Sequence, residues 1–206
     1  MYEELKGLGF VVITVALDRS ADDARPWIET ARPTHPALID TAHVLADLYN
    51  MVNVPTILWI DERGRIVRPN DVAFGDDTFQ RTTRLEAARH LGALRTWVRD
   101  GVRPFTDEQV RALQVQPSAA DQEARACFGL GEWLYGQGRR EAAARHFARG
   151  AELAPHDFTI RRGTMRMVGL DPMGPEFRLM YREWTEAGRP YYRPLPDTAG
   201  TDPSGM

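Results

Sequence analysis

Side chains that commonly carry out catalysis are few in this chain. The single cysteine is Cys127, so the 206 residues can form neither an intramolecular disulfide nor a cysteine-rich metal site. A reactive thiol needs exposure and a lowered pKa. Cys127 instead lies between Ala126 and Phe128, at a packing position of a predicted helix. We therefore expect Cys127 to pack in a core, and we assign no catalytic residue within this sequence.

Histidines and acidic residues do not predict a metal site or a cofactor either. No two histidines have the His-x-x-x-His spacing that metal ligands on a helix require. The neighbouring carboxylates Asp22–Asp23 and Asp76–Asp77 would not point at one another, so helix N-terminal charge and loop solvation explain them better. The sequence also lacks a glycine-rich phosphate loop and a Gly-x-Ser-x-Gly motif. The histidines are His35, His43, His90, His146 and His156.

The most informative stretch runs from Tyr49 to Val67. Its pattern predicts a helix end, an X-Pro step, an apolar strand over 56–60, an Asp-x-x-Gly turn and a second strand over 65–68. Gly64 supplies the positive φ that such a turn usually requires. Proline is tolerated at the first position of a strand, and X-Pro is the only peptide bond for which the cis form costs under about 1 kcal/mol.

Strands and helices alternate through the first 100 residues. The continuous apolar run 10–17 predicts a strand buried on both faces, as in α/β sheets. A helix over 21–31 follows, with Ser20 as its N-cap and with Trp27 and Ile28 expected to face inward. The order strand, helix, strand, helix, strand, strand, helix predicts an α/β domain. Its other predicted elements are a helix tail at 2–8, a strand at 37–39, helices at 41–49 and 82–99, and a loop at 69–81.

The step Val54-Pro55-Thr56 into an apolar strand, followed by Asp61-x-x-Gly64, resembles the second half of a thioredoxin-like domain. The similarity is to redoxins of the TlpA/ResA-like type and covers about residues 1–100. It implies a cis peptide bond before the proline, which faces the redox motif, and a substrate-binding role for Val54, Pro55 and Thr56. It also implies thiol–disulfide exchange with a protein or peptide thiol partner.

The resemblance places the reactive motif upstream of Met1, between a first strand and a first long helix. Without that strand, the strands at 10–17 and 56–60 would have unpaired backbone groups and open apolar faces. We therefore expect an open reading frame upstream that encodes an apolar strand and then Trp-x-x-Cys, or a UGA codon read as selenocysteine. The alternative is a non-catalytic interaction module that is folded, monodisperse and silent in thiol assays. A peroxiredoxin-like peroxidase would also need the absent cysteine.

A second pattern begins after a predicted linker at 101–120, which includes a helical turn near 107–113. The region 121–188 resembles a tetratricopeptide repeat (TPR), with its helix pair at about 124–157. The small residues Gly131 and Ala143 predict that the two helices cross closely. The positions that carry the resemblance are Leu130, Gly131, Leu134, Ala143, Phe147 and Pro155.

Further helices are predicted at 158–169 and 173–187, before a flexible tail at 189–206. The pairs Arg139–Arg140 and Arg161–Arg162 are expected on solvated faces, although a TPR groove can use arginines to bind an acidic peptide partner.

Composition excludes several functional classes. The net charge of −3 gives no reason to expect nucleic-acid binding. No apolar run approaches the roughly 18 residues that a membrane span needs, and the acidic N-terminus is not a signal peptide. The default expectation for the compartment is the cytoplasm.

Overall fold

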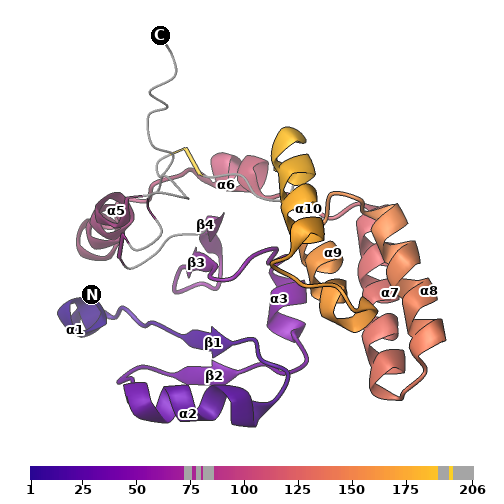
Figure 1. Cartoon of the computed structure of the whole chain (residues 1–206). Coiled ribbons are helices and arrows are strands. Elements are labelled where there is room, and N and C mark those ends of the chain that lie inside the picture. Colours follow the sequence, from indigo (N-terminus) through magenta and orange to yellow (C-terminus); the bar gives the residue numbers. More distant parts are fainter. Residues whose placement is uncertain (72–75, 78–79, 81–85, 190–194, 197–206) are drawn as a thin grey trace. The chain divides into compact units, whose positions relative to one another are not determined.

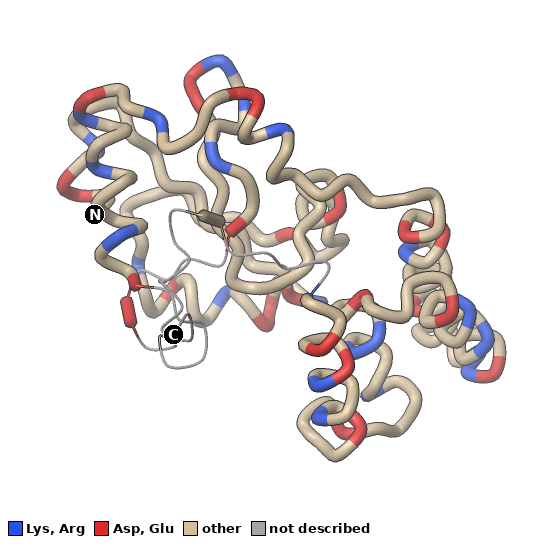
Figure 2. The backbone as a smooth tube through the Cα atoms, turned by 90° about the horizontal axis from the view of Figure 1, so that it is seen from above, with Lys and Arg blue, Asp and Glu red and all other residues tan. Residues whose placement is uncertain are grey.

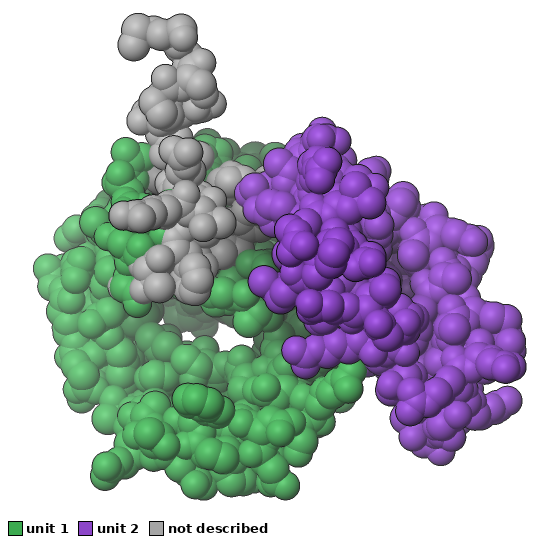
Figure 3. Space-filling model, viewed as in Figure 1, with its two compact units in different colours: residues 1–114, 194–206 green, residues 115–193 purple. Residues whose placement is uncertain are grey.

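The chain forms two compact units. The computed structural model describes residues 1–71, 76–77, 80, 86–189 and 195–196. Unit 1 comprises residues 1–114 together with 194–206, and unit 2 comprises residues 115–193 (Figure 3). The units therefore meet in sequence after Gln114. Most of the segment expected as a linker, including its short helix, belongs to unit 1.

Unit 1 follows the expected order of strands and helices. β1 and β2 pair in parallel, and β3 and β4 pair antiparallel, as two separate two-stranded sheets (Figure 1). The elements are α1 (Tyr2–Leu5), the 3-10 turn η1 (Lys6–Leu8), β1 (Thr14–Ala16), α2 (Ala21–Ala31), β2 (Ala37–Ile39), α3 (Val44–Leu48), β3 (Ile57–Ile60), β4 (Ile66–Asp71), α5 (Ala87–Asp100) and α6 (Asp107–Leu113).

The β1–α2–β2 segment has the expected elements but not the expected burial. Ser20 caps α2, because its hydroxyl accepts a hydrogen bond from the Asp22 backbone N–H. The strand is shorter than predicted, however, and Val11 and Ile13 are 58% and 59% exposed. Trp27 is 78% exposed, so its predicted inward orientation is wrong. Burial on both faces requires covering layers and neighbouring strands, and β1 has β2 as its sole strand neighbour among the described residues.

The β3–β4 hairpin forms as predicted across the turn that ends at Gly64, whose φ is +76°. β4 continues to Asp71, so the prediction of a loop at 69–71 is wrong. Pro69 is tolerated there because β4 pairs with β3 alone among the described residues, and a missing backbone N–H on such an edge breaks few ladder bonds. The predicted start of the next helix, at 82–85, lies outside the described residues.

The core of unit 1 lies between the hairpin, α5 and the N-terminal helix. Leu5, Trp59, Val67 and Leu94 form a buried cluster. Trp59 stacks on Trp97 of α5, with ring centroids 5.2 Å apart and planes 10° apart. A second cluster joins Phe105 and Val110 to Leu195. Leu195 is buried, so the expectation of a flexible tail from 189 onward is wrong at this residue.

The described residues of unit 2 form helices and their connecting turns, with no strand. The pair α7 and α8 is joined by a turn in which Gly138 has a φ of +76°. Ala143 and Phe147 of α8 are buried together with Leu134 of α7. The elements are α7 (Ala119–Gly136), α8 (Arg140–Leu153), α9 (Phe158–Thr164), the 3-10 turn η2 (Met165–Val168) and α10 (Pro175–Glu186).

Charged residues of both signs alternate along the described backbone of each unit, without a long stripe of one sign (Figure 2). Across the described residues, no helix has both the length and the apolar character needed to cross a membrane.

Candidate functional site

The loop before β3 holds the three residues that the sequence proposes for substrate binding. The Val54–Pro55 peptide bond is cis, as the pattern leads us to expect. The Val54 side chain is 70% exposed and Pro55 is exposed, whereas Thr56 is half-buried. The Thr56 hydroxyl donates to the backbone carbonyl of Asn53. The loop therefore presents Val54 and Pro55 outward and holds Thr56 against its own backbone.

Asn70 fixes this loop from the neighbouring strand. Its side-chain amide, on β4, donates to the backbone carbonyls of Tyr49 at 2.6 Å and of Asn50 at 3.0 Å. Asn50 has a φ of +49°, in the left-handed region that asparagine adopts more readily than most residues. The sequence analysis missed Asn70 because it placed this residue in a loop. The signal in the sequence that could have identified Asn70 is a polar side chain directly after Pro69, near the end of a strand.

The N-terminal helix connects the two small sheets of unit 1. On one side, Leu5 packs in the cluster with Trp59 and Val67 of the hairpin. On the other side, the Tyr2 ring meets the His35 ring edge-on at 5.6 Å, just before β2. The Thr14 hydroxyl of β1 lies 3.3 Å from Nε2 of the same histidine. This helix thus holds the sheets in one unit without joining their strands.

Glutamates on α1 reinforce the connection. Glu4 pairs with Arg95 at 3.0 Å and with Arg99 at 2.6 Å, both on α5. The hydrogen bond from Arg95 is the main reason that the pKa of Glu4 is lowered. Glu3 accepts from Thr34, and its pKa is lowered chiefly by the hydrogen bond from Lys6.

A buried ion pair lies on β4. Arg68 and Asp71 are 2.7 Å apart, and both side chains are fully buried. The Arg68 guanidinium lies over the Trp59 ring at 5.1 Å and over the Phe105 ring at 5.5 Å. His90 is also buried, with its ring edge-on to Trp59 at 5.4 Å. The ion pair and His90 are thus buried against the aromatic rings of the unit 1 core.

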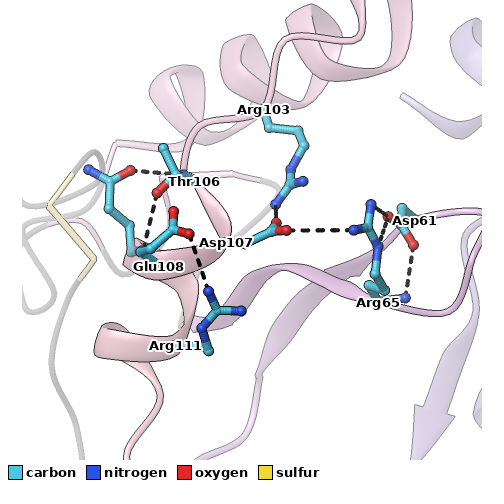
Figure 4. Close-up of polar contacts among 8 residues, drawn as sticks. Asp61, Arg65, Arg103, Thr106, Asp107, Glu108 and Arg111 are labelled. Atoms are coloured by element: carbon cyan, nitrogen blue, oxygen red, sulfur yellow. Dashed lines mark hydrogen bonds and ion pairs between the residues drawn. The ribbon is translucent and has the colours of Figure 1, made fainter.

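The tip of the hairpin is tied to α6 by a network of charges (Figure 4). Asp61 accepts from the Arg65 backbone N–H at 2.8 Å and from its Nε at 2.9 Å. These bonds, the backbone one foremost, lower the pKa of Asp61. Arg65 also reaches Asp107 of α6 at 3.5 Å. The pKa of Asp107 is lowered mainly by its hydrogen bond from Arg103.

The other candidate residues do not assemble into a site. Cys127 is half-buried in α7. Across the residues that the structure describes, no group of three or more histidine, cysteine or acidic side chains could hold a metal ion.

The arginine pairs of unit 2 make specific contacts. Arg140 donates to the Tyr135 hydroxyl at 2.9 Å, and Arg161 pairs with Glu183 at 3.0 Å. Arg162 lies over the Phe177 ring at 4.9 Å. These arginines therefore pack on the helical surface of their own unit as well as facing solvent.

The loop before β3 exposes the Val54 side chain and Pro55, and the segment that leads into it from α3 is held by Asn70. No family model, curated protein or solved structure matches this chain.

Proposed function

We propose that residues 1–100 are part of a thioredoxin-like redoxin domain related to thiol–disulfide oxidoreductases. Its reactive cysteine or selenocysteine motif would lie upstream of Met1, and a TPR-like helical region would follow it. The observation that carries the proposal is the outward-facing Val54–Pro55 loop before β3, whose beginning, just after α3, is held by Asn70. The order β1–α2–β2–α3–β3–β4–α5 supports it.

In this function the loop binds substrate rather than reacting with it. An extended thiol-bearing peptide would lie along the backbone at Val54, with Pro55 and Thr56 shaping the contact. Backbone hydrogen bonds to an extended peptide give affinity without demanding a particular side chain. The thiolate that exchanges with the substrate would come from the upstream motif.

The test begins with the DNA upstream of Met1, read in frame with UGA allowed as a sense codon. We expect an apolar strand and then Trp-x-x-Cys, or UGA in place of the cysteine codon. The longer chain, with cysteine at that codon, should reduce the disulfides of insulin, and the 206-residue chain is the matched control. An early stop with no strand-coding segment would refute the proposal.

A second candidate function is a non-catalytic module that binds peptides. The exposed apolar side chains beside β1 and β3 favour it, since they offer a surface for a partner. This candidate requires the purified 206-residue chain to be folded, monodisperse and inactive with thiols. The redoxin proposal predicts poor solubility instead, because open strand edges associate.

A further inference from the structure

The C-terminal segment buries one leucine in unit 1. Leu195 is 2% exposed, whereas its described neighbour Pro196 is exposed. Leu195 therefore inserts a single side chain from a segment whose next residue lies at the surface. The residues that cluster with it, here called the leucine socket, are Ile66 of β4, Phe105 before α6, and Val110 and Leu113 of α6.

The leucine socket has supports of its own that do not involve the tail. Asp107, at the start of α6, pairs with Arg103 and lies 3.5 Å from Arg65, directly before β4 (Figure 4). The Phe105 ring also meets the Arg68 guanidinium, at 5.5 Å. These contacts join α6, the turn before it and β4 to one another. The socket should therefore keep its walls when the buried leucine leaves.

Leu195 is remote in sequence from the socket that holds it. Residues 115–193, which lie between α6 and the tail in the sequence, form unit 2, a compact unit of their own. A contact that closes so long a loop costs more chain entropy than a local contact does. Segments held by few buried apolar contacts are also the ones that open locally while the rest of a protein stays folded. Leu195 is thus the member of the cluster that is best able to leave.

We propose that Leu195 is a displaceable internal ligand, and that the leucine socket binds a leucine-bearing segment of a partner protein when Leu195 leaves. The tail sequence Arg193-Pro194-Leu195-Pro196 gives the chemistry of the segment that fits, a leucine between two prolines. Proline fixes its own φ, so such a segment loses little chain entropy when it binds. The seated tail therefore blocks the socket, and a partner segment competes with it.

This inference goes beyond the proposed function. The socket is built from β4, α6 and the turn before α6, and it needs neither the Val54–Pro55 loop nor a reactive cysteine. A failed insulin assay therefore leaves the inference standing. Failure of the binding test below leaves the redox proposal standing.

The probe is a capped peptide with the sequence of residues 193–198, Arg-Pro-Leu-Pro-Asp-Thr. It is titrated into the ¹⁵N-labelled 206-residue chain and followed by NMR, because burial of one leucine supports only about millimolar affinity or weaker. Leu195→Asp removes the internal ligand. In this variant we expect the peptide to shift the amide signals of Ile66 and of residues 105–113. The wild type should need at least about tenfold more peptide, since its socket is occupied.

Matched controls separate the socket from general effects of a new charge. Leu130→Asp makes the same substitution at an exposed leucine of unit 2 and should respond to the peptide like the wild type. A peptide that itself carries Leu195→Asp should shift none of these signals in either protein. The double variant Leu195→Asp with Leu113→Asp places a charge in the socket and should lose the shifts that Leu195→Asp shows.

Three results would overturn the proposal. Loss of the cooperative urea transition in Leu195→Asp would make this leucine an inseparable part of the core. Equal shifts in the wild type and in Leu195→Asp, or none in either, would show that the socket does not exchange the tail for a partner segment. A wild-type dimer that Leu195→Asp converts to a monomer would place each leucine in the socket of a second copy.

Discussion

Gly131 of α7 lies directly against the ring of Phe147 on α8. A Cβ at residue 131 would lie 2.5 Å from Cε1 of that ring, closer than real Cβ contacts come. Gly131→Ala should therefore force the two helices or the ring to shift, at about 1–3 kcal/mol of lost stability. Urea denaturation of the full chain, followed by circular dichroism, measures this loss.

Gly129 is the control for this prediction. It lies in the same helix, and a Cβ there would meet nothing within 4 Å. Gly129→Ala should raise stability by about 0.5–1 kcal/mol, because alanine is the better helix former. If both alanine variants shift the urea midpoint in the same direction, glycine at residue 131 is not required for the close crossing of α7 and α8.

The second prediction concerns Asn70 and the loop before β3. Asn70→Ala removes two hydrogen bonds, to the carbonyls of Tyr49 and Asn50, each worth about 1 kcal/mol net. We expect amide hydrogen exchange across 49–56 to accelerate by about tenfold or more, since 1.4 kcal/mol corresponds to tenfold. Asn53→Ala is the matched control, because the loop uses the Asn53 backbone carbonyl. Equal exchange in the two variants would contradict the bracing role.

Local chemistry explains how much of this fold could be predicted. The cap at Ser20 and the turn at Gly64 could be predicted because each depends only on neighbours within a few residues of the sequence. Local chemistry did not predict that the side chains of Trp27 and Ile13 would be exposed. An apolar residue is buried by what packs on it, and periodicity states only that a face is available.

Tertiary contacts account for the remaining differences. β4 continues from its predicted end at Arg68 to Asp71, and these two residues form a buried ion pair in which Arg68 lies over the rings of Trp59 and Phe105. Leu195 is buried with Phe105 and Val110, which lie about 85 residues earlier in the sequence. In the candidate site, the X-Pro pattern alone was enough to propose Val54 and Pro55 as substrate-binding residues. Asn70 could not be proposed in this way, since its partners are about 20 residues away.

The third prediction tests the buried ion pair. Arg68→Met leaves Asp71 buried without its cation, which should cost about 3–5 kcal/mol. Replacing both residues, as Arg68→Met with Asp71→Leu, should recover most of that loss, because no uncompensated charge stays buried. Arg111→Met is the control at an exposed pair with Glu108 and should cost under about 1 kcal/mol. If the double variant is no more stable than Arg68→Met, the uncompensated charge of Asp71 is not the cause of the lost stability.

The fourth prediction concerns acid and the hairpin turn. The pKa of Asp61 is lowered in the folded state, first by the backbone N–H of Arg65 and then by its side chain. A lowered carboxyl pKa stabilises the fold fully above the unfolded value, near 3.8, and that contribution disappears as the pH falls through the folded value. Asp61→Asn keeps an acceptor oxygen but removes the charge. It should therefore lower the urea midpoint near neutral pH, and the difference from the wild type should shrink below pH 3.8.

Glu62→Gln removes a charge from the same turn without touching the bonds that Asp61 accepts. Its difference from the wild type should be small near neutral pH. If the Asp61→Asn difference is instead constant across the acid range, the carboxylate does not stabilise the turn through its charge. A constant loss would instead come from the geometry of the hydrogen bonds that Asp61 accepts from the backbone N–H groups of Arg63 and Arg65.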